Sequence, residues 1–145
     1  MRVLVVTPTY DERDNLEPLC AAVLASPVGA DFLVVDDASP DGTGELADRI
    51  ASREPRFRVI HRAGKLGLGS AYVEAFCFAL GEGYDAVVTM DGDRSHDPAY
   101  LPALVEAASR ADLVIGSRYL NGISVANCER IRRFKSQFTT LMPFR

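Results

Sequence analysis

Two carboxylates stand at the end of an apolar stretch in the second half of the chain. Asp91 and Asp93 follow the run Asp85–Met90, which reads Asp-Ala-Val-Val-Thr-Met and is typical of a buried strand. Two carboxylates this close together repel each other unless one is protonated or a cation lies between them. Mg²⁺ and Mn²⁺ prefer oxygen ligands and keep open positions for the phosphates of a substrate. The spacing therefore predicts a divalent metal site, with a solvated acidic turn as the alternative.

Two other uses of an Asp-x-Asp sequence fit this chain poorly. A calcium-binding EF-hand loop beginning at Asp91 needs glycine at its sixth position and glutamate at its twelfth, where the chain has His96 and Pro102. A phosphatase that forms a phosphoaspartate is expected to carry its Asp-x-Asp motif after the first strand, whereas Asp91 follows the fourth apolar run. His96 and the other histidine, His61, are interpreted as structural or edge residues rather than catalytic bases.

A second acidic pair and a glycine-rich stretch follow two other apolar runs. Asp36 and Asp37 end the run that begins at Phe32 and lead into a Ser-Pro-Asp-Gly turn. A carboxylate there can accept hydrogen bonds from ribose hydroxyls or a base N–H, or it can cap a helix. The glycines of Gly64–Gly69 allow a backbone to approach a ligand closely, and Lys65 supplies a positive charge. Their spacing matches neither a P-loop nor a dinucleotide-binding fingerprint.

Apolar runs alternate with amphipathic stretches along the chain. The runs are rich in Val, Ile and Leu, as buried parallel strands are, and lie at Val3–Thr7, Phe32–Asp36, Arg58–His61, Ala86–Met90 and Leu113–Gly116. The stretches of helical period lie near residues 13–25, 43–53, 69–81 and 98–109. This alternation predicts an α/β fold with a Rossmann-like, doubly wound, mostly parallel sheet. Ligands of such sheets bind beyond the carboxyl ends of the strands, where each of these runs continues into polar, charged or glycine-rich sequence.

Composition restricts the class of protein. A chain of 145 residues with 48% hydrophobic side chains suits one α/β domain with a core. No apolar run reaches the ~18 residues of a membrane-spanning helix, and the first residues indicate a strand rather than a signal peptide. The three cysteines are widely spaced, which favours a reducing, cytoplasmic compartment over disulfides or a zinc site.

Charge is distributed unevenly along the chain. Residues 1–117 hold ten basic and nineteen acidic side chains, whereas residues 118–145 hold six basic and one acidic side chain. The acidic body argues against nucleic-acid binding. The tail, in which Arg130, Arg132, Arg133, Lys135 and Arg145 alternate with apolar residues, predicts contact with an anionic membrane surface, or a solvated tail with a few apolar residues docked on the body.

Five segments, taken together and in this order, resemble the polyprenyl- or dolichyl-phosphate mannose synthases, which are family-two glycosyltransferases. They are Pro8–Glu12, Val34–Thr43, Gly64–Gly69, Met90–His96 and Gly116–Tyr119. The resemblance covers about residues 1–136 and implies a GT-A glycosyltransferase fold. It implies a nucleotide-sugar-binding core over residues 1–120. It also implies that residues 121–145 begin an acceptor region that is incomplete, as in a C-terminally truncated chain.

The resemblance also implies roles for individual residues. Contacts to the nucleotide fall to Pro8, Tyr10, Glu12, Asp37 and Lys65. Asp91 and Asp93 would hold Mg²⁺ or Mn²⁺ and flank the sugar diphosphate, with Ser95 as a further metal ligand. Arg118 and Arg132 would meet phosphates.

The implied reaction is transfer of mannose from GDP-mannose to a polyprenyl phosphate, with inversion at the anomeric carbon, by a hexosyltransferase similar to dolichyl-phosphate β-D-mannosyltransferase. Such an enzyme would lie peripherally at the cytoplasmic face of a membrane, with a membrane protein as a further partner. Two alternatives remain open. The same fold can use UDP-glucose or another nucleotide sugar with a lipid phosphate, because one contact can reverse the choice of base or sugar. The chain can also be a binding module without turnover.

Some positions depart from the family pattern. Asp11 stands where the family usually has asparagine, and Cys128 lies near a position where it favours tryptophan. Residues 137–145 are expected to fall outside the pattern. These departures concern the acceptor side more than the nucleotide side, so we expect donor binding to be retained and transfer by this chain alone to be slow or absent.

Overall fold

One six-stranded sheet forms the centre of the protein. The structure, a computed structural model, describes residues 1–117 and the backbone of residues 138–143. The strands are β1 (Val3–Thr9), β2 (Asp31–Asp36), β3 (Phe57–His61), β4 (Ala86–Thr89), β5 (Val114–Ser117) and β6 (Phe138–Pro143). Their order is β3-β2-β1-β4-β6-β5. Strands β1 to β4 are parallel, and β6 runs antiparallel between β4 and β5, so the predicted α/β, mostly parallel sheet is confirmed.

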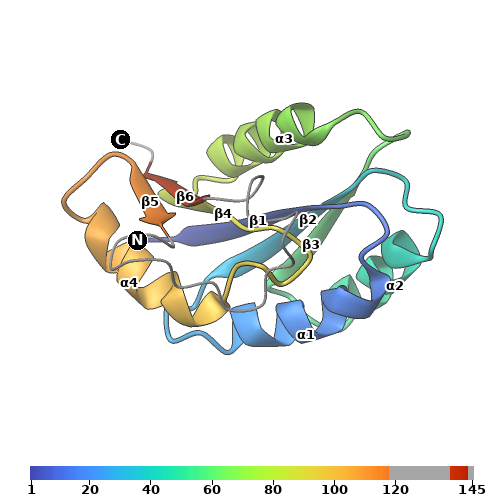
Figure 1. Ribbon diagram of the computed structural model, residues 1–145, viewed down its shortest axis with the longest axis horizontal. Coiled ribbons are helices and arrows are strands. Elements are labelled where there is room, and N and C mark those ends of the chain that lie inside the picture. Colours follow the sequence, from blue (N-terminus) through green and yellow to red (C-terminus); the bar gives the residue numbers. More distant parts are fainter. Residues whose placement is uncertain (118–137, 144–145) are drawn as a thin grey trace.

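Helices cover both faces of this sheet. On one face lie α1 (Arg13–Leu24), α2 (Thr43–Ala51) and α4 (Leu101–Ala108), and on the other lies α3 (Leu68–Gly81) (Figure 1). A short 3₁₀ turn, η1 (Pro98–Tyr100), precedes α4, and the side chain of Asp97 accepts from the N–H of Ala99 to cap it.

Alternation along β1 divides the core in two. Val3 and Val5 pack with α1, α2 and α4, whereas Leu4 and Val6 pack with α3. Successive side chains of a strand point to opposite faces, so an unbroken apolar run is what a sheet covered on both faces requires. Helix α3 meets the sheet through three fully buried alanines one turn apart, Ala71, Ala75 and Ala79, which let it lie close to the strands.

The C-terminal edge of the sheet differs from the sequence-based expectation. No strand is predicted from the sequence after residue 117, yet residues 138–143 form β6 and pair with β4 and β5 along the lengths of those two strands. Strand β5 was expected to be buried, but its residues are half-buried or exposed, with Ile115 at 47% exposure. Within the described residues, no helix is long and apolar enough to span a membrane.

Candidate functional site

The carboxyl ends of β1, β2, β3 and β4 meet at one edge of the sheet. Parallel pairing places Thr9 opposite Asp36, and Asp36 opposite His61. Val6 lies opposite Thr89, so β4 ends beside the same edge. The segments that leave these strands are therefore neighbours in space, as the sequence analysis predicted for a site at this edge.

The two adjacent aspartates after β2 have different surroundings. Asp36 is 2% exposed, and its carboxylate accepts hydrogen bonds from Thr9 Oγ1 at 3.0 Å, the Ser39 N–H at 3.1 Å and Ser39 Oγ at 2.6 Å. It lies on the α2 side, where a Cβ at position 44 would come within 3.1 Å of its Oδ2. Asp36 therefore stabilises the turn after β2 and does not cap α2, whose N-cap residue is Gly42.

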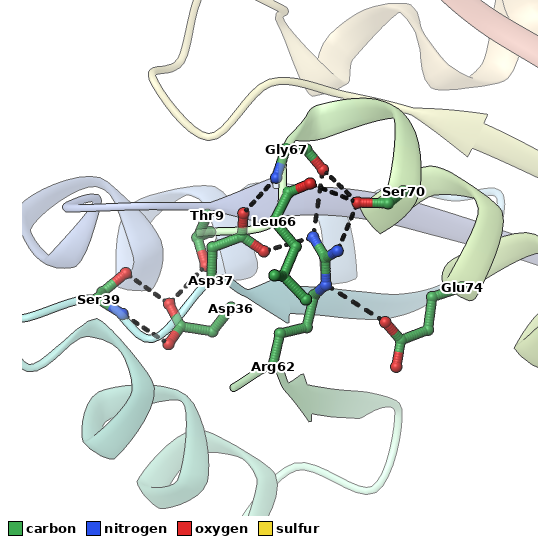
Figure 2. Close-up of polar contacts among 9 residues, drawn as sticks. All are labelled: Thr9, Asp36, Asp37, Ser39, Arg62, Leu66, Gly67, Ser70 and Glu74. Atoms are coloured by element: carbon green, nitrogen blue, oxygen red, sulfur yellow. Dashed lines mark hydrogen bonds and ion pairs between the residues drawn. The ribbon is translucent and has the colours of Figure 1, made fainter. Parts of the chain in front are cut away.

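Asp37 faces the opposite side of the sheet, toward the start of α3. Its N–H donates to the carbonyl of Thr9 at 3.0 Å, which ties β2 to the end of β1. Its Oδ1 accepts a hydrogen bond from Nη1 of Arg62, and its Oδ2 lies 3.4 Å from the N–H of Gly67 (Figure 2). The residue is 7% exposed, so this carboxylate is buried and paired with a charge.

Tyr10 and Lys65 are brought together from separate segments of the chain. The Lys65 ammonium lies 3.7 Å from the centre of the Tyr10 ring, a cation–π contact. Tyr10 is 37% exposed, so part of its ring is open to a ligand. Pro8 lies on β1 opposite Val35 and is half-buried.

Glu12 directly precedes α1 and lies close to the segment that follows Asp36 and Asp37. Its N–H donates to Thr43 Oγ1 at 3.1 Å, and its Oε2 accepts from Asn15 Nδ2 at 2.7 Å. A Cβ at Gly92 would lie 3.1 Å from Glu12 Cγ. Glycine at this position therefore lets the turn between Asp91 and Asp93 approach Glu12 closely.

Local hydrogen bonds fix the turn after β4, which carries Asp91 and Asp93. The Asp91 N–H donates to Nδ1 of the buried His96 at 3.1 Å, and Asp93 Oδ1 accepts from the Ser95 N–H at 2.9 Å. Arg94 adopts a positive φ of 61°, which turns the chain between Asp93 and Ser95. In the part of the chain that the structure describes, no three His, Cys, Asp or Glu side chains gather into a metal cluster.

That donor set still fits one kind of metal. Mg²⁺ is commonly bound through one or two carboxylates plus substrate phosphates and waters, rather than by a cage of protein ligands. Asp91 and Asp93 supply two hard oxygen donors on one turn, the type that Mg²⁺ and Mn²⁺ take. The predicted roles of Asp91, Asp93 and Ser95 as ligands stay predictions.

Helix α3 adds a phenol to this edge. Burial, and then the negative charge of nearby Asp91, raise the pKa of Tyr72 above its ordinary value. Tyr72 stacks on Phe76, with ring centres 6.1 Å apart. No role for Tyr72 or for Arg62 was predicted from the sequence. An arginine directly after a strand and before a glycine-rich loop was the available signal for Arg62. Arg118 and Arg132, which were predicted to meet phosphates, lie outside the described residues.

Comparison with known proteins identifies the family. The family described as glycosyl transferase family 2 matches residues 4–145. The chain belongs to glycosyl transferase family 2. The match extends over residues 137–145, which were expected to fall outside the family pattern.

Two curated relatives belong to the branch that the motifs resemble. An undecaprenyl-phosphate mannosyltransferase of Micrococcus luteus is 49% identical over 99% of this chain and 59% of its own length. A polyprenol monophosphomannose synthase of Mycolicibacterium smegmatis is 48% identical over 87% of this chain and 48% of its own length. The chain thus spans about half the length of these relatives.

A solved structure supports the GT-A fold. A mannosyltransferase from Pyrobaculum calidifontis, in complex with GDP-Man and Mn²⁺, superposes with a TM-score of 0.66. It is 24% identical over 80% of this chain and 34% of its own. At this identity the likeness shows the fold, and the predicted GT-A architecture is confirmed.

Proposed function

We propose that this chain is the donor-binding part of an inverting mannosyltransferase that moves mannose from GDP-mannose to a polyprenyl phosphate. The observation that carries the proposal is the meeting of Tyr10, Asp37 and Asp91 at one sheet edge. Two relatives near 48% identity are named for mannosyl transfer to such lipids. The nucleotide-sugar core would comprise residues 1–120, and residues 121–145 would begin the acceptor side.

The nucleoside would lie between β1, β2 and the loop that follows β3. There the open part of the Tyr10 ring can stack on the base, and Asp37 can accept hydrogen bonds from base or ribose. Lys65 brings a positive charge to the same side, within reach of the diphosphate. Pro8 and Glu12 would line the pocket from β1 and the start of α1.

Asp91 and Asp93 would hold Mg²⁺ or Mn²⁺, with Ser95 as an additional ligand. When bound, the ion neutralises the charge that develops on the departing nucleoside diphosphate. The chain's own contribution is a fixed turn. His96 accepts from the Asp91 N–H, and the Ser95 N–H donates to the Asp93 carboxylate, so the turn is fixed before substrate arrives.

The acceptor is a phosphate monoester, which is already ionised at neutral pH. Its oxygen would attack the anomeric carbon from the side opposite the departing diphosphate, and this displacement inverts the configuration. No strong general base is needed, so positioning and charge stabilisation supply most of the rate.

Arg118 and Arg132 would contribute positive charge for the phosphates. The basic tail would bring the protein to the anionic cytoplasmic surface of the membrane that holds the acceptor, where a membrane protein is a potential partner.

The test is calorimetric titration of the chain with GDP-mannose and with UDP-glucose, each with Mn²⁺ and with EDTA. We expect GDP-mannose to bind in Mn²⁺ at least about 10-fold more tightly than UDP-glucose. The reverse preference would favour the UDP-glucose alternative. Binding of neither nucleotide sugar would contradict the proposal.

A transfer assay with a short polyprenyl phosphate separates catalysis from donor binding. Donor binding without transfer by this chain would agree with our expectation and with the binding-module alternative. Transfer by a full-length relative under the same conditions would then decide whether residues beyond those in this chain supply the acceptor site.

A further inference from the structure

Arg62 is a buried cation at the centre of the polar contacts beside the proposed nucleoside site. Its side chain is only 4% exposed. Arginine is rarely buried to this degree unless it is paired. It follows β3 directly and lies between the end of β2 and the start of α3 (Figure 2). Nothing in the proposed reaction gives this residue a direct contact with substrate.

The guanidinium joins two segments that are separate in the sequence. Nη1 donates to Asp37 Oδ1 and to the carbonyl of Gly67, the latter at 3.2 Å. Nη2 donates to Ser70 Oγ at 2.5 Å. Nε lies 3.3 Å from Glu74 Oε2, an ion pair without hydrogen-bond geometry. One planar group thus fixes the Asp37 carboxylate relative to the first turn of α3.

The backbone of the glycine-rich loop is built around these contacts. Gly67 has a φ of +95°, which side chains other than glycine rarely adopt. That conformation directs its N–H toward Asp37 Oδ2 while its carbonyl accepts from Arg62. The same loop carries Lys65 to the Tyr10 ring. Arg62 therefore connects Asp37, Tyr10 and Lys65, the residues that our proposed function assigns to the nucleotide.

We infer that Arg62 is a positioning residue for the nucleoside diphosphate, acting through the Asp37 carboxylate and the Gly64–Gly69 loop. Arg62 at Oδ1 and the Gly67 N–H near Oδ2 together keep the Asp37 carboxylate in one orientation. The inference rests on the proposed function. It requires an arginine fork rather than a positive charge alone, because lysine cannot reach Asp37, Gly67 and Ser70 from one fixed plane.

The experiment measures GDP affinity in Mn²⁺ for Arg62→Met, Arg62→Lys, Asp37→Asn and the double variant Arg62→Met/Asp37→Asn. We expect each single change at Arg62 or Asp37 to weaken GDP binding by about 10-fold or more. If Arg62 acts through Asp37, the double variant binds no more weakly than the weaker single variant, because the two losses share one cause. Arg58→Met is the matched control, since Arg58 is an exposed arginine on the same strand. It should change GDP affinity less than about 2-fold.

Each outcome decides something different. If the GDP affinity of Arg62→Met stays within about 2-fold of that of the unmodified chain, Arg62 has only a structural role and the inference is overturned. This holds even if the melting temperature of the variant is lowered. Losses that multiply in the double variant would also overturn it, since they would indicate a direct contact with nucleotide. If Arg62→Met does not fold, Arg62→Lys and Ser70→Ala carry the test, and unchanged affinity in both overturns the inference. An unmodified chain that binds no nucleoside diphosphate would overturn the proposed function and this inference together.

Discussion

The backbone N–H of Asp91 donates a hydrogen bond to Nδ1 of His96 at 3.1 Å. A ring nitrogen that accepts carries no proton, so a neutral ring has its proton on Nε2, which lies 3.8 Å from Asp91 Oδ2. His96 is buried, with 7% of its surface exposed. Its ring lies beside both the backbone N–H and the carboxylate of Asp91. The interpretation of His96 as a structural residue agrees with this geometry.

Replacing His96 should disturb the turn that carries the acidic pair. His96→Ala leaves the Asp91 N–H without this acceptor and opens a small cavity, so we expect the free energy of unfolding to fall by about 1–3 kcal/mol. His61→Ala is the control, because His61 pairs with the exposed Asp48 at the surface and such pairs contribute little. Urea denaturation of both variants measures the difference. Equal effects at the two histidines would contradict the role of His96.

Asp41 gives a prediction about pH. Burial acts to raise the pKa of Asp41, but hydrogen bonds from Thr43 and from the Arg13 N–H outweigh it and hold the pKa below its ordinary value of 3.8. A lowered pKa means that the ionised form stabilises the folded state, and this stabilisation is present above pH 3.8 and is lost as pH falls through the folded pKa.

We therefore expect Asp41→Ala to lower the free energy of unfolding by about 1 kcal/mol at neutral pH. The difference from the unmodified chain should shrink as pH falls below 3.8 and through the folded pKa, because the unmodified chain then loses its ionised carboxylate. Urea denaturation at pH 7 and at pH 3 measures the change. A difference that stays constant over this range would show that the charge of Asp41 contributes nothing.

Strands β1, β2 and β4 were predictable because each contains a continuous run of buried apolar residues, as burial on both faces requires. Strand β3 is only partly buried, and its signal was the branched pair Val59 and Ile60. Strand β6 was not predictable, since Phe138–Pro143 is neither continuously apolar nor alternating, ends in a proline, and follows residues without strand or helix periodicity. Its antiparallel place between β4 and β5 depends on contacts between segments distant in sequence.

The candidate site was predictable in location but not in its internal contacts. That polar residues follow the strands could be read from the sequence, and the parallel pairing brings them to one edge. Asp36 stabilises the turn after β2, whereas Asp37 faces α3. This division depends on the face of the sheet that each residue occupies. The partnership of Asp37 with Arg62 spans 25 residues, and no local pattern encodes it.

Tyr10 should bind the nucleoside through its ring rather than its hydroxyl. Stacking of a base on an aromatic side chain contributes about 1–3 kcal/mol, so Tyr10→Ala should weaken GDP binding by about 5-fold or more. Tyr10→Phe keeps the ring and the contact with Lys65, so its affinity should stay within about 2-fold of the unmodified chain. Fluorescence titration with GDP measures both. A large loss in Tyr10→Phe would instead assign the role to the hydroxyl group.

Metal dependence is the sharpest test of the acidic pair. Asp93→Asn keeps the size of the side chain and an oxygen that can accept from the Ser95 N–H, but it removes the charge that a divalent ion needs. We expect GDP-mannose affinity in Mn²⁺ to fall by about 10-fold or more, with a change in unfolding free energy below about 0.5 kcal/mol.

Asp97→Asn is the matched control, because Asp97 caps η1 and asparagine caps equally well. Calorimetry in Mn²⁺ and in EDTA compares the two variants. Equal GDP-mannose affinity of the unmodified chain under both conditions would show that no metal takes part in donor binding, and equal losses in both variants would show that Asp93 has no special role.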